Sequence, residues 1–318
     1  MGTAERTALA EEIIESLDAI NGHHPGHRAV HAKGTFWRGS FNPTSEAASL
    51  SRAAHLRAGP VPVLGRFSNA SGNPRTSDAN PLAGRGMAVK FEPTGSEPTD
   101  IVAVALPVWV VRTPEDFLAF TRSRAPEPDT GQPDPEKFGA FLGDHPEAAR
   151  ALQLGMPSLA PVRSFACSEF NALHAFALVD ADGERTWGRY GWRPAAEIDR
   201  LTEDEIAEAD RDHLQAEIRE RLAEGTAAFS LEFTLAAEGD SLEDPTDPWE
   251  GERETVTLGA LEIESVIEDA EAEGPIVFDP MRLIDGIEPS EDPILAIRPV
   301  AYSISVERRG GELAGGPG

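Results

Sequence analysis

The chain has 318 residues, 40% of them hydrophobic, and a formal net charge of −27 at pH 7. That length suggests one or two domains with a sizeable core. A surface this acidic repels nucleic acid and anionic membranes, so neither is expected as a partner. Because Cys167 is the one cysteine, an intrachain disulfide and a thiolate metal cluster are excluded.

The N-terminal stretch has apolar residues at helical spacing and predicts a helix over residues 4–20, ended by Asn21-Gly22. It is acidic and amphipathic, unlike a basic and then apolar leader sequence. The longest apolar run, residues 101–111, is too short to span a bilayer. We therefore expect a soluble cytoplasmic protein.

Three histidines, His23, His24 and His27, follow the first helix. A histidine cluster can bind a metal ion, but the spacing here is irregular and Pro25-Gly26 interrupts it. A metal site at this place is disfavoured.

Arg28-Ala29-Val30-His31-Ala32-Lys33-Gly34 comes next. A single histidine in an apolar strand is most simply a core or surface residue. A neutral imidazole can also take a proton from one substrate atom and return it to another. His31 is therefore a candidate acid–base residue.

The rest of the chain alternates between strand-like and helical patterns. Strands are expected over residues 61–68, 86–91, 100–111, 229–236 and 255–263, and a hairpin over 170–179 and 185–193. Helices are expected over residues 46–58, from Thr113, in two stretches that end near Pro157, and over 201–224 with a capping box from Thr202 to Glu205. Residues 126–136 and 245–251 are expected as loops, and residues 311–318 as disordered.

A last segment, residues 286–302, contains the most specific pair. Ser290 or Asp292 can cap a helix there, and in such a helix Arg298 and Tyr302 share one face. A guanidinium beside a phenol stabilises the phenolate, which is a hard ligand suited to ferric haem iron. Pro299 should kink the helix or mark an irregularity in it. The simplest alternative is a surface helix with one partly buried tyrosine, and the residues just after Tyr302 would also suit a strand.

Together these stretches resemble the haem catalases over residues 22–309, including Gly65-Arg66-Phe67-Ser68 and Arg85 to Phe91. The resemblance implies one α+β domain: an antiparallel eight-stranded β-barrel with helices around it, and haem b between the barrel and the C-terminal helix. It divides the chain into an N-terminal helix (1–21), a haem-binding core (22–309) and a flexible tail (310–318).

The resemblance also implies roles for single residues. Tyr302 would bind the iron, and His31 would be the catalytic acid–base residue. The cofactor-binding residues would be Arg28, Arg66 and Arg309 at the haem propionates, Ser68 in a hydrogen bond with His31, Arg298 beside Tyr302, and Val30 and Phe117. Without the resemblance, Arg66 is an ordinary strand-end charge and Ser68 a turn cap.

One departure from the catalase pattern bears on activity. Val104-Ala105-Leu106-Pro107 stands where catalases carry Asn-Asn-Thr-Pro, so Ala105 replaces the amide that orients a second peroxide. The chain is also little longer than a bare catalase core. Both features are typical of the catalase-related peroxidases, the minimal members of the superfamily.

The leading expectation is thus a haem peroxidase that reduces hydrogen peroxide or organic peroxides with small organic donors, shows weak catalase activity, and is a monomer or homodimer. The alternatives are a lipid-hydroperoxide-converting enzyme similar to allene oxide synthase and a minimal true catalase. A haem sensor without turnover is less favoured, because it needs no His31, and a purely structural protein is least favoured.

Overall fold

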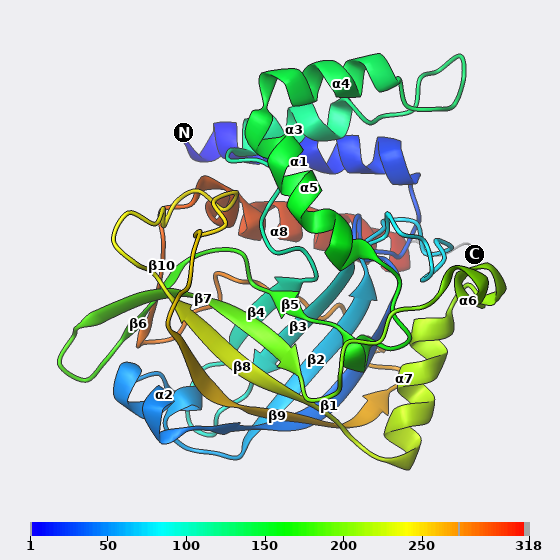
Figure 1. Ribbon diagram of the computed structural model, residues 1–318. Coiled ribbons are helices and arrows are strands. Elements are labelled where there is room, and N and C mark those ends of the chain that lie inside the picture. Colours follow the sequence, from blue (N-terminus) through cyan, green and yellow to red (C-terminus); the bar gives the residue numbers. More distant parts are fainter. Residues whose placement is uncertain (1, 273, 315–318) are drawn as a thin grey trace.

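Antiparallel strands close into a barrel in the computed structural model, which describes residues 2–272 and 274–314 (Figure 1). A group of helices lies over one end of this barrel, and other helices lie along its side and at its other end. The expected α+β barrel architecture is confirmed.

Eight strands form the closed ring, in the order β7-β5-β4-β3-β2-β1-β9-β8, and the β7–β8 pairing closes it. They are β1 (Gly34–Pro43), β2 (Val61–Asn69), β3 (Arg85–Phe91), β4 (Thr99–Val104), β5 (Phe170–Asn171), β7 (Arg185–Pro194), β8 (Ala227–Leu235) and β9 (Thr255–Ile267). Two short strands, β6 (Phe176–Val179) and β10 (Ile287–Pro289), extend the sheet beyond β7.

The barrel interior is filled with aromatic and aliphatic side chains. Trp37 and Phe41 point inward from β1, and Phe67 from β2 stacks on Phe165 at a centroid separation of 4.9 Å. Because inward and outward side chains alternate along each strand, the inward set fills a small barrel as a packed core. The barrel is thus a rigid support, and its end provides the functional residues.

The helices of the cap pack on one another as well as on the barrel. They are α1 (Thr3–Asn21), α3 (Pro114–Arg122), α4 (Pro135–Asp144), α5 (Pro146–Leu159) and α8 (Pro293–Ala314). Ala10 and Ile13 of α1 meet Leu118 of α3 and Ile297 of α8 in a small apolar cluster. The first and last helices of the chain therefore lie against each other (Figure 1).

Two stretches that were each expected to form one helix are divided into two helical segments. Residues 46–58 form α2 (Ser45–Leu50) and η1 (Ala54–Leu56), because Ser51 is extended and its hydroxyl donates to the carbonyl of Gly286. Residues 201–224 form α6 (Glu203–Glu208) and α7 (His213–Glu224). The chain turns between them, where Arg211 O accepts from the N–H of Asp78, and the Asp78 carboxylate accepts from the N–H of Leu214 in the first turn of α7.

Two strand expectations also need correction, and one strand was not expected. The expected strand over residues 100–111 ends at Val104, shortly before Pro107, which lacks an N–H for a ladder. The expected strand over residues 170–179 is split into β5 and β6 around Leu173, whose φ is 58°. The sequence patterns did not indicate β1, and a further 3-10 turn, η2 (Phe165–Cys167), follows α5.

Helix α8 is assigned as one helix through Pro299 and continues to Ala314, so the residues after Tyr302 are helical. The helix thus reaches into the segment expected as a flexible tail from residue 310, and residues 315–318 lie outside the described chain. Asp292, rather than Ser290, caps the helix: its Oδ1 accepts the N–H groups of Ile294 (2.8 Å) and Leu295 (3.2 Å).

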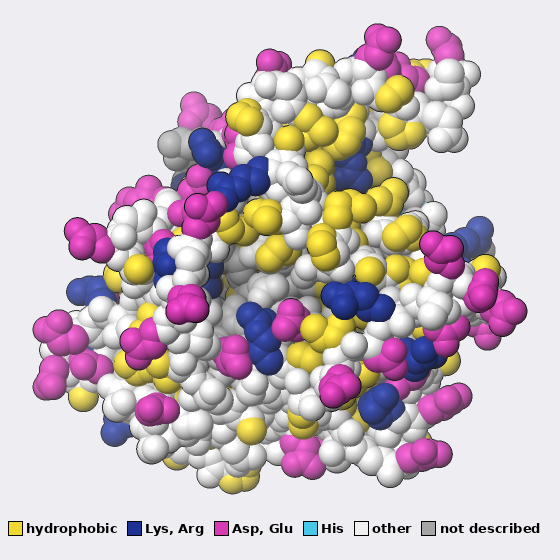
Figure 2. Space-filling model, in the orientation of Figure 1, with side chains coloured by type: hydrophobic (Ala, Val, Ile, Leu, Met, Phe, Trp, Pro, Cys, Tyr) yellow, Lys and Arg dark blue, Asp and Glu magenta, His cyan; other side chains and the backbone are white. Residues whose placement is uncertain are grey.

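Acidic side chains are spread over the face shown in Figure 2, and hydrophobic ones gather between the helical cap and the barrel. Leu154 and Met156 of α5 are among the exposed large hydrophobic residues. Within the described ranges, no helix is both long and apolar enough to cross a membrane.

Candidate active site

Tyr302 is held by Arg298, one helical turn before it on α8. The phenol oxygen accepts two hydrogen bonds from this guanidinium, from Nε at 2.9 Å and from Nη2 at 2.7 Å. Two charge-assisted donors on one oxygen stabilise negative charge there. The expected pairing of these two residues is confirmed, and it suits a phenolate ligand for a hard metal ion.

Two buried residues, His174 and Asp292, hold Arg298 in place. Its Nη1 lies 2.9 Å from Nε2 of His174, and His174 Nδ1 lies 2.6 Å from Oδ2 of Asp292. Burial and the positive charge of Arg298 lower the pKa of His174 despite the neighbouring Asp292. The imidazole is thus neutral, with Nδ1–H donating to Asp292 and Nε2 accepting from Arg298. The guanidinium charge is directed at Tyr302.

The sequence pattern suggests a strand around His31. In the structure, His31 lies in the loop before β1. Its φ of 57° is in the left-handed region, which non-glycine residues seldom occupy. The loop is held there because the N–H of His31 donates to Ala70 O (3.3 Å) and the N–H of Ala32 to Ser71 O (3.0 Å). Such conformations persist where the surrounding structure enforces them, often at functional sites.

Ser68 orients the His31 ring. Nδ1 of His31 lies 2.9 Å from the Ser68 hydroxyl, which itself donates to the carbonyl of Gly86 at 3.4 Å. Because the Ser68 hydroxyl gives its hydrogen to Gly86 O, its oxygen accepts the hydrogen bond from Nδ1–H of His31. Nε2 of His31 then carries no hydrogen and can accept a proton. Burial and the charges of Arg66, Arg298 and Arg28 lower the pKa of His31 to about 3. The ring is therefore neutral near pH 7.

Gly86 leaves the space that the His31–Ser68 pair needs. A methyl group on it would lie 2.7 Å from Cε1 of His31 and 2.9 Å from Oγ of Ser68. We expect Gly86→Ala to displace the imidazole and to lower the free energy of unfolding by about 1–3 kcal/mol, as overpacking does. Denaturant unfolding measures this change.

The matched control is Gly139→Ala in helix α4, where an added methyl meets nothing within 4 Å. That variant should be neutral or more stable by up to about 1 kcal/mol. Equal stability of the Gly86 and Gly139 variants would show that the His31 pocket is not tightly packed around Gly86.

Three arginines gather beside this pocket. The guanidinium carbons of Arg28 and Arg66 lie 5.5 and 5.4 Å from the centroid of the Phe36 ring. Burial, then the charges of Arg28 and Arg309, lower the pKa of Arg66. Nε of Arg66 and both Nε and Nη1 of Arg309 are buried without a hydrogen-bond partner. Unpaired buried donors are costly, so the cluster fits anionic ligand groups.

Glu271 is the carboxylate that already lies among them. Its oxygens accept from Arg28 at 2.8 and 3.1 Å and from the N–H of Ile276 at 2.8 Å, and lie 3.4 Å from Arg309. Burial alone would raise the pKa of Glu271, but Arg28 and Arg309 hold it below its ordinary value. One carboxylate against three guanidiniums leaves a local excess of two positive charges.

The loop that carries His31 is tied to the helix that carries Tyr302. The N–H of Ala29 donates to Oγ of Ser305 at 3.4 Å, and Ser305 lies three residues after Tyr302 on α8.

Phe117 of α3 is half-buried and packs against Trp109 at a centroid separation of 5.5 Å. Val30 is also half-buried and precedes His31. Ala105 is buried just beyond β4, with its N–H bonded to Arg85 O at 2.9 Å.

The structure thus links most of the sequence-predicted residues: His31 contacts Ser68, Arg298 contacts Tyr302, and Arg28 and Arg309 both contact Glu271. Sequence reasoning missed His174, Glu271 and Gly86. The Asp292 side chain was foreseen only as a cap, yet its second oxygen also holds His174.

The chain is similar to proteins of one known family. The family model described as "Catalase" matches residues 6–313. The chain belongs to the catalase family. It is 38% identical over 302 residues to the catalase-related peroxidase of Mycolicibacterium paratuberculosis, covering 95% of each chain. It is 32% identical to the catalase-related peroxidase of Synechococcus elongatus, covering 97% of this chain and 91% of that one.

Solved catalases share the fold at lower identity. A bacterial catalase matches with a TM-score of 0.78 at 21% identity over 93% of this chain, and a fungal catalase with 0.80 at 22% over 94%. The chain spans only 60% and 62% of the length of those two proteins. As a member of the catalase family with catalase-related peroxidases among its relatives, the protein is an oxidoreductase.

Proposed function

We propose that this catalase-family enzyme is a haem b peroxidase that reduces hydrogen peroxide with small organic electron donors. The observation that carries the proposal is the pair of hydrogen bonds from Arg298 to the Tyr302 oxygen. A phenol placed in this way has the chemistry of an axial ligand to ferric iron. His31, oriented by Ser68, supplies the acid–base group that peroxide cleavage needs.

The residues fit a haem. Tyr302 would hold the iron, and the unpaired donors of Arg66 and Arg309, with Arg28, would hold two propionates. Two propionates together with Glu271 supply three negative charges for three guanidiniums, which balances the cluster. Val30 and Phe117 would contribute apolar contacts to the cofactor pocket.

In the reaction, haem iron would supply the site at which peroxide binds and through which electrons pass. Nε2 of His31 takes the proton from one peroxide oxygen and delivers it to the other as the O–O bond breaks. Ser68 keeps the ring in the tautomer that can do this. Overall, two donor molecules each lose one electron, and one peroxide takes up two electrons and two protons to become two water molecules.

The apolar side chain of Val104 favours peroxidase over catalase turnover. Val104 pairs with Gly86, which lies against His31, whereas Ala105 pairs with Arg85 and its methyl group points to the other face of the strand. Oxygen release needs a second peroxide to be oriented as a reductant, and neither Val104 nor Ala105 offers a side-chain hydrogen bond for it. Small donors need no such orientation. The alternatives, a minimal true catalase and a lipid-hydroperoxide-converting enzyme, are outcomes of the test below. We also propose that the enzyme works in the cytoplasm as a single haem domain, monomeric or homodimeric.

We expect Val104→Asn to raise oxygen release from hydrogen peroxide about tenfold, the effect of one added hydrogen bond of about 1.4 kcal/mol. Oxygen release by electrode and oxidation of a phenolic donor by absorbance are measured in one preparation. Val104→Leu is the control of similar size without an amide, and it should show no gain. Wild-type oxygen release near 10⁷–10⁸ M⁻¹s⁻¹, the range of the fastest enzymes, would instead make the protein a true catalase. Selective turnover of lipid hydroperoxides without donor oxidation would instead make the protein a lipid-hydroperoxide-converting enzyme.

A further inference from the structure

The carboxylate of Asp78 contacts both chain segments that form the His31–Ser68 pair. Lys33 lies two residues after His31, and its Nζ lies 2.9 Å from Oδ1 of Asp78. Asn69 directly follows Ser68, and its Nδ2 donates to the same oxygen at 3.3 Å. The side chain of Asp78 is fully buried, and that of Lys33 is 12% exposed. One buried charge thus joins two segments that lie far apart in the sequence.

Backbone hydrogen bonds hold the same two segments together. The N–H of Asn69 donates to Lys33 O at 3.0 Å, and Oδ1 of Asn69 accepts from the N–H of Ser71 at 3.0 Å. Ser71 O in turn accepts from the N–H of Ala32 at 3.0 Å. His31, whose φ lies in the left-handed region, therefore has its C-terminal side fixed to the segment of Asn69.

The start of helix α7 anchors Asp78 from the other direction. The N–H of Asp78 donates to Arg211 O at 2.8 Å, and its Oδ2 accepts from the N–H of Leu214 at 3.2 Å. Lys33 reaches the same place, because its Nζ lies 2.8 Å from Oδ1 of Asp212. Helix α7 lies along the side of the barrel (Figure 1). The Asp78 carboxylate thus connects this helix to the acid–base pair.

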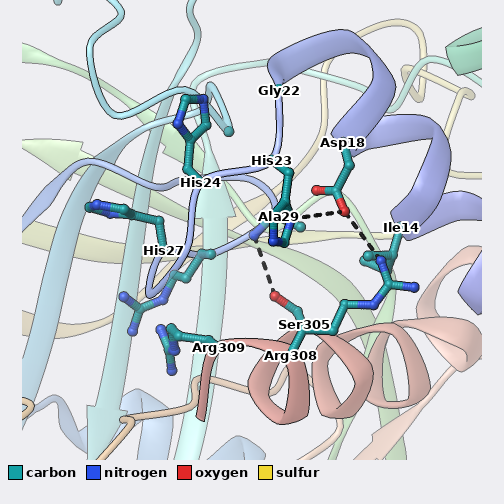
Figure 3. A pocket seen from close by; sticks show the side chains of 12 residues that line it. Ile14, Asp18, Gly22, His23, His24, His27, Ala29, Ser305, Arg308 and Arg309 are labelled. Atoms are coloured by element: carbon teal, nitrogen blue, oxygen red, sulfur yellow. Dashed lines mark hydrogen bonds and ion pairs between the residues drawn. The ribbon is translucent and has the colours of Figure 1, made fainter. Parts of the chain in front are cut away.

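The contacts before His31 hold the loop to other parts of the molecule. Figure 3 shows one of them, the hydrogen bond from the N–H of Ala29 to Oγ of Ser305 on α8, at 3.4 Å. Asp78 differs from these contacts, because it holds the segment after His31 and the segment after Ser68 at the same time. A shift of the Asp78 side chain would therefore change how His31 and Ser68 face each other.

We propose that Asp78 is a positioning residue for the reaction with peroxide. It holds His31 and Ser68 in the arrangement that leaves Nε2 of His31 able to accept a proton. The proposal rests on the proposed peroxidase function and adds to it the residue that supports the acid–base pair. A displacement of about 1 Å at a reacting group can cost about 10²-fold in rate, so such groups depend on firm supporting contacts.

The test is a double-variant cycle on the haem-loaded protein. Asp78→Asn is made in the wild type and in His31→Ala, and stopped-flow absorbance gives the rate with hydrogen peroxide for all four proteins. The substitution keeps the size of the side chain, and Lys33 keeps Asp212 as a partner. We expect Asp78→Asn to slow the reaction by about 10- to 10²-fold where His31 is present. In the His31→Ala protein it should change the rate by less than about twofold, as for a residue without a separate effect.

Asp100→Asn is the matched control. The Lys90–Asp100 pair has the same separation, 2.9 Å, and the same side-chain exposures, 12% and 0%, as the Lys33–Asp78 pair. It lies near the other end of β3 from Gly86, the glycine that contacts His31. Asp100→Asn should therefore react with peroxide like the wild type, whatever its effect on stability. If Asp78→Asn does not fold, Lys33→Gln changes the same contact from its more exposed side, and the same background-dependent loss is expected.

Equal slowing by Asp78→Asn in both backgrounds would overturn the proposal, because a general loss of structure does not depend on His31. A wild-type rate in Asp78→Asn, or an equal loss in Asp100→Asn, would overturn it as well.

Cyanide separates this proposal from the peroxidase function. Hydrogen cyanide must also lose a proton when it binds ferric haem, so its binding rate repeats the cycle without peroxide. If cyanide binding shows the dependence on both Asp78 and His31 but no donor is oxidised, the positioning role stands and the peroxidase function fails. If donors are oxidised by the wild type but neither cycle shows coupling, the peroxidase function stands and the positioning role fails.

Discussion

Replacing His31 by alanine should slow the reaction of the haem-loaded protein with hydrogen peroxide by about 10²–10⁴-fold, the usual contribution of a general acid–base group. His31 is the residue whose Nε2 is left as a proton acceptor, because Ser68 takes the hydrogen on Nδ1. The variant should still bind haem, since His31 does not hold Tyr302 or the arginine cluster.

Stopped-flow absorbance with peroxide gives the rate, and His24→Ala in the neighbouring loop is the control that should react like the wild type. The pH dependence adds a second readout. Because the pKa of His31 is lowered to about 3, the neutral and competent form persists as the pH falls. The wild-type rate should therefore stay level from about pH 8 to pH 5. A His31→Ala rate within about twofold of the wild type, far below the range for such groups, would make His31 a structural residue only.

Replacing Tyr302 by phenylalanine should cost haem affinity by at least about 10²-fold, since removal of a metal ligand or its close support has effects of about this size or more. The change deletes one oxygen atom, but that oxygen accepts both hydrogen bonds from Arg298. The variant loses the iron ligand and leaves two guanidinium N–H groups without their acceptor. The network behind them, His174 and Asp292, stays in place.

The chain offers a matched control, because it has two tyrosines. Tyr190 is buried in the barrel core and its hydroxyl has no hydrogen-bond partner. Tyr190→Phe should keep haem binding and be equally stable or more stable. Titration of each apoprotein with haemin, followed by absorbance, separates the two variants. Haem content and spectrum unchanged in Tyr302→Phe would refute the ligand assignment.

The sequence was sufficient for residues that act within short motifs. Arg298 and Tyr302 are one helical turn apart, so their contact follows from helix geometry alone. The barrel strands with regular alternation, such as β2 and β3, were predicted to within a residue or two. The partnership of His31 with Ser68 came from the family resemblance, because 37 residues separate them.

What the sequence could not show depends on contacts between distant segments. His174 meets Arg298 across 124 residues, and nothing in its own neighbourhood marks it. Glu271 is one of many acidic residues, and only the folded loop places it against Arg28. Gly86 reads as an ordinary strand glycine until the His31 ring is seen against it. The break between α6 and α7 likewise depends on Asp78, from a loop more than 100 residues earlier.

The most direct test of the whole account is the absorption spectrum of the purified wild-type protein, with its haem content measured on the same sample. A phenolate held by Arg298 predicts about one haem b per chain, the high-spin ferric spectrum of a tyrosinate-ligated haem, and a spectral change on addition of hydrogen peroxide. If the purified protein holds little haem, it is titrated with haemin. A titration that reaches no stoichiometric endpoint and shows only the spectrum of free haemin would contradict the assignment of Tyr302 and the peroxidase function built on it.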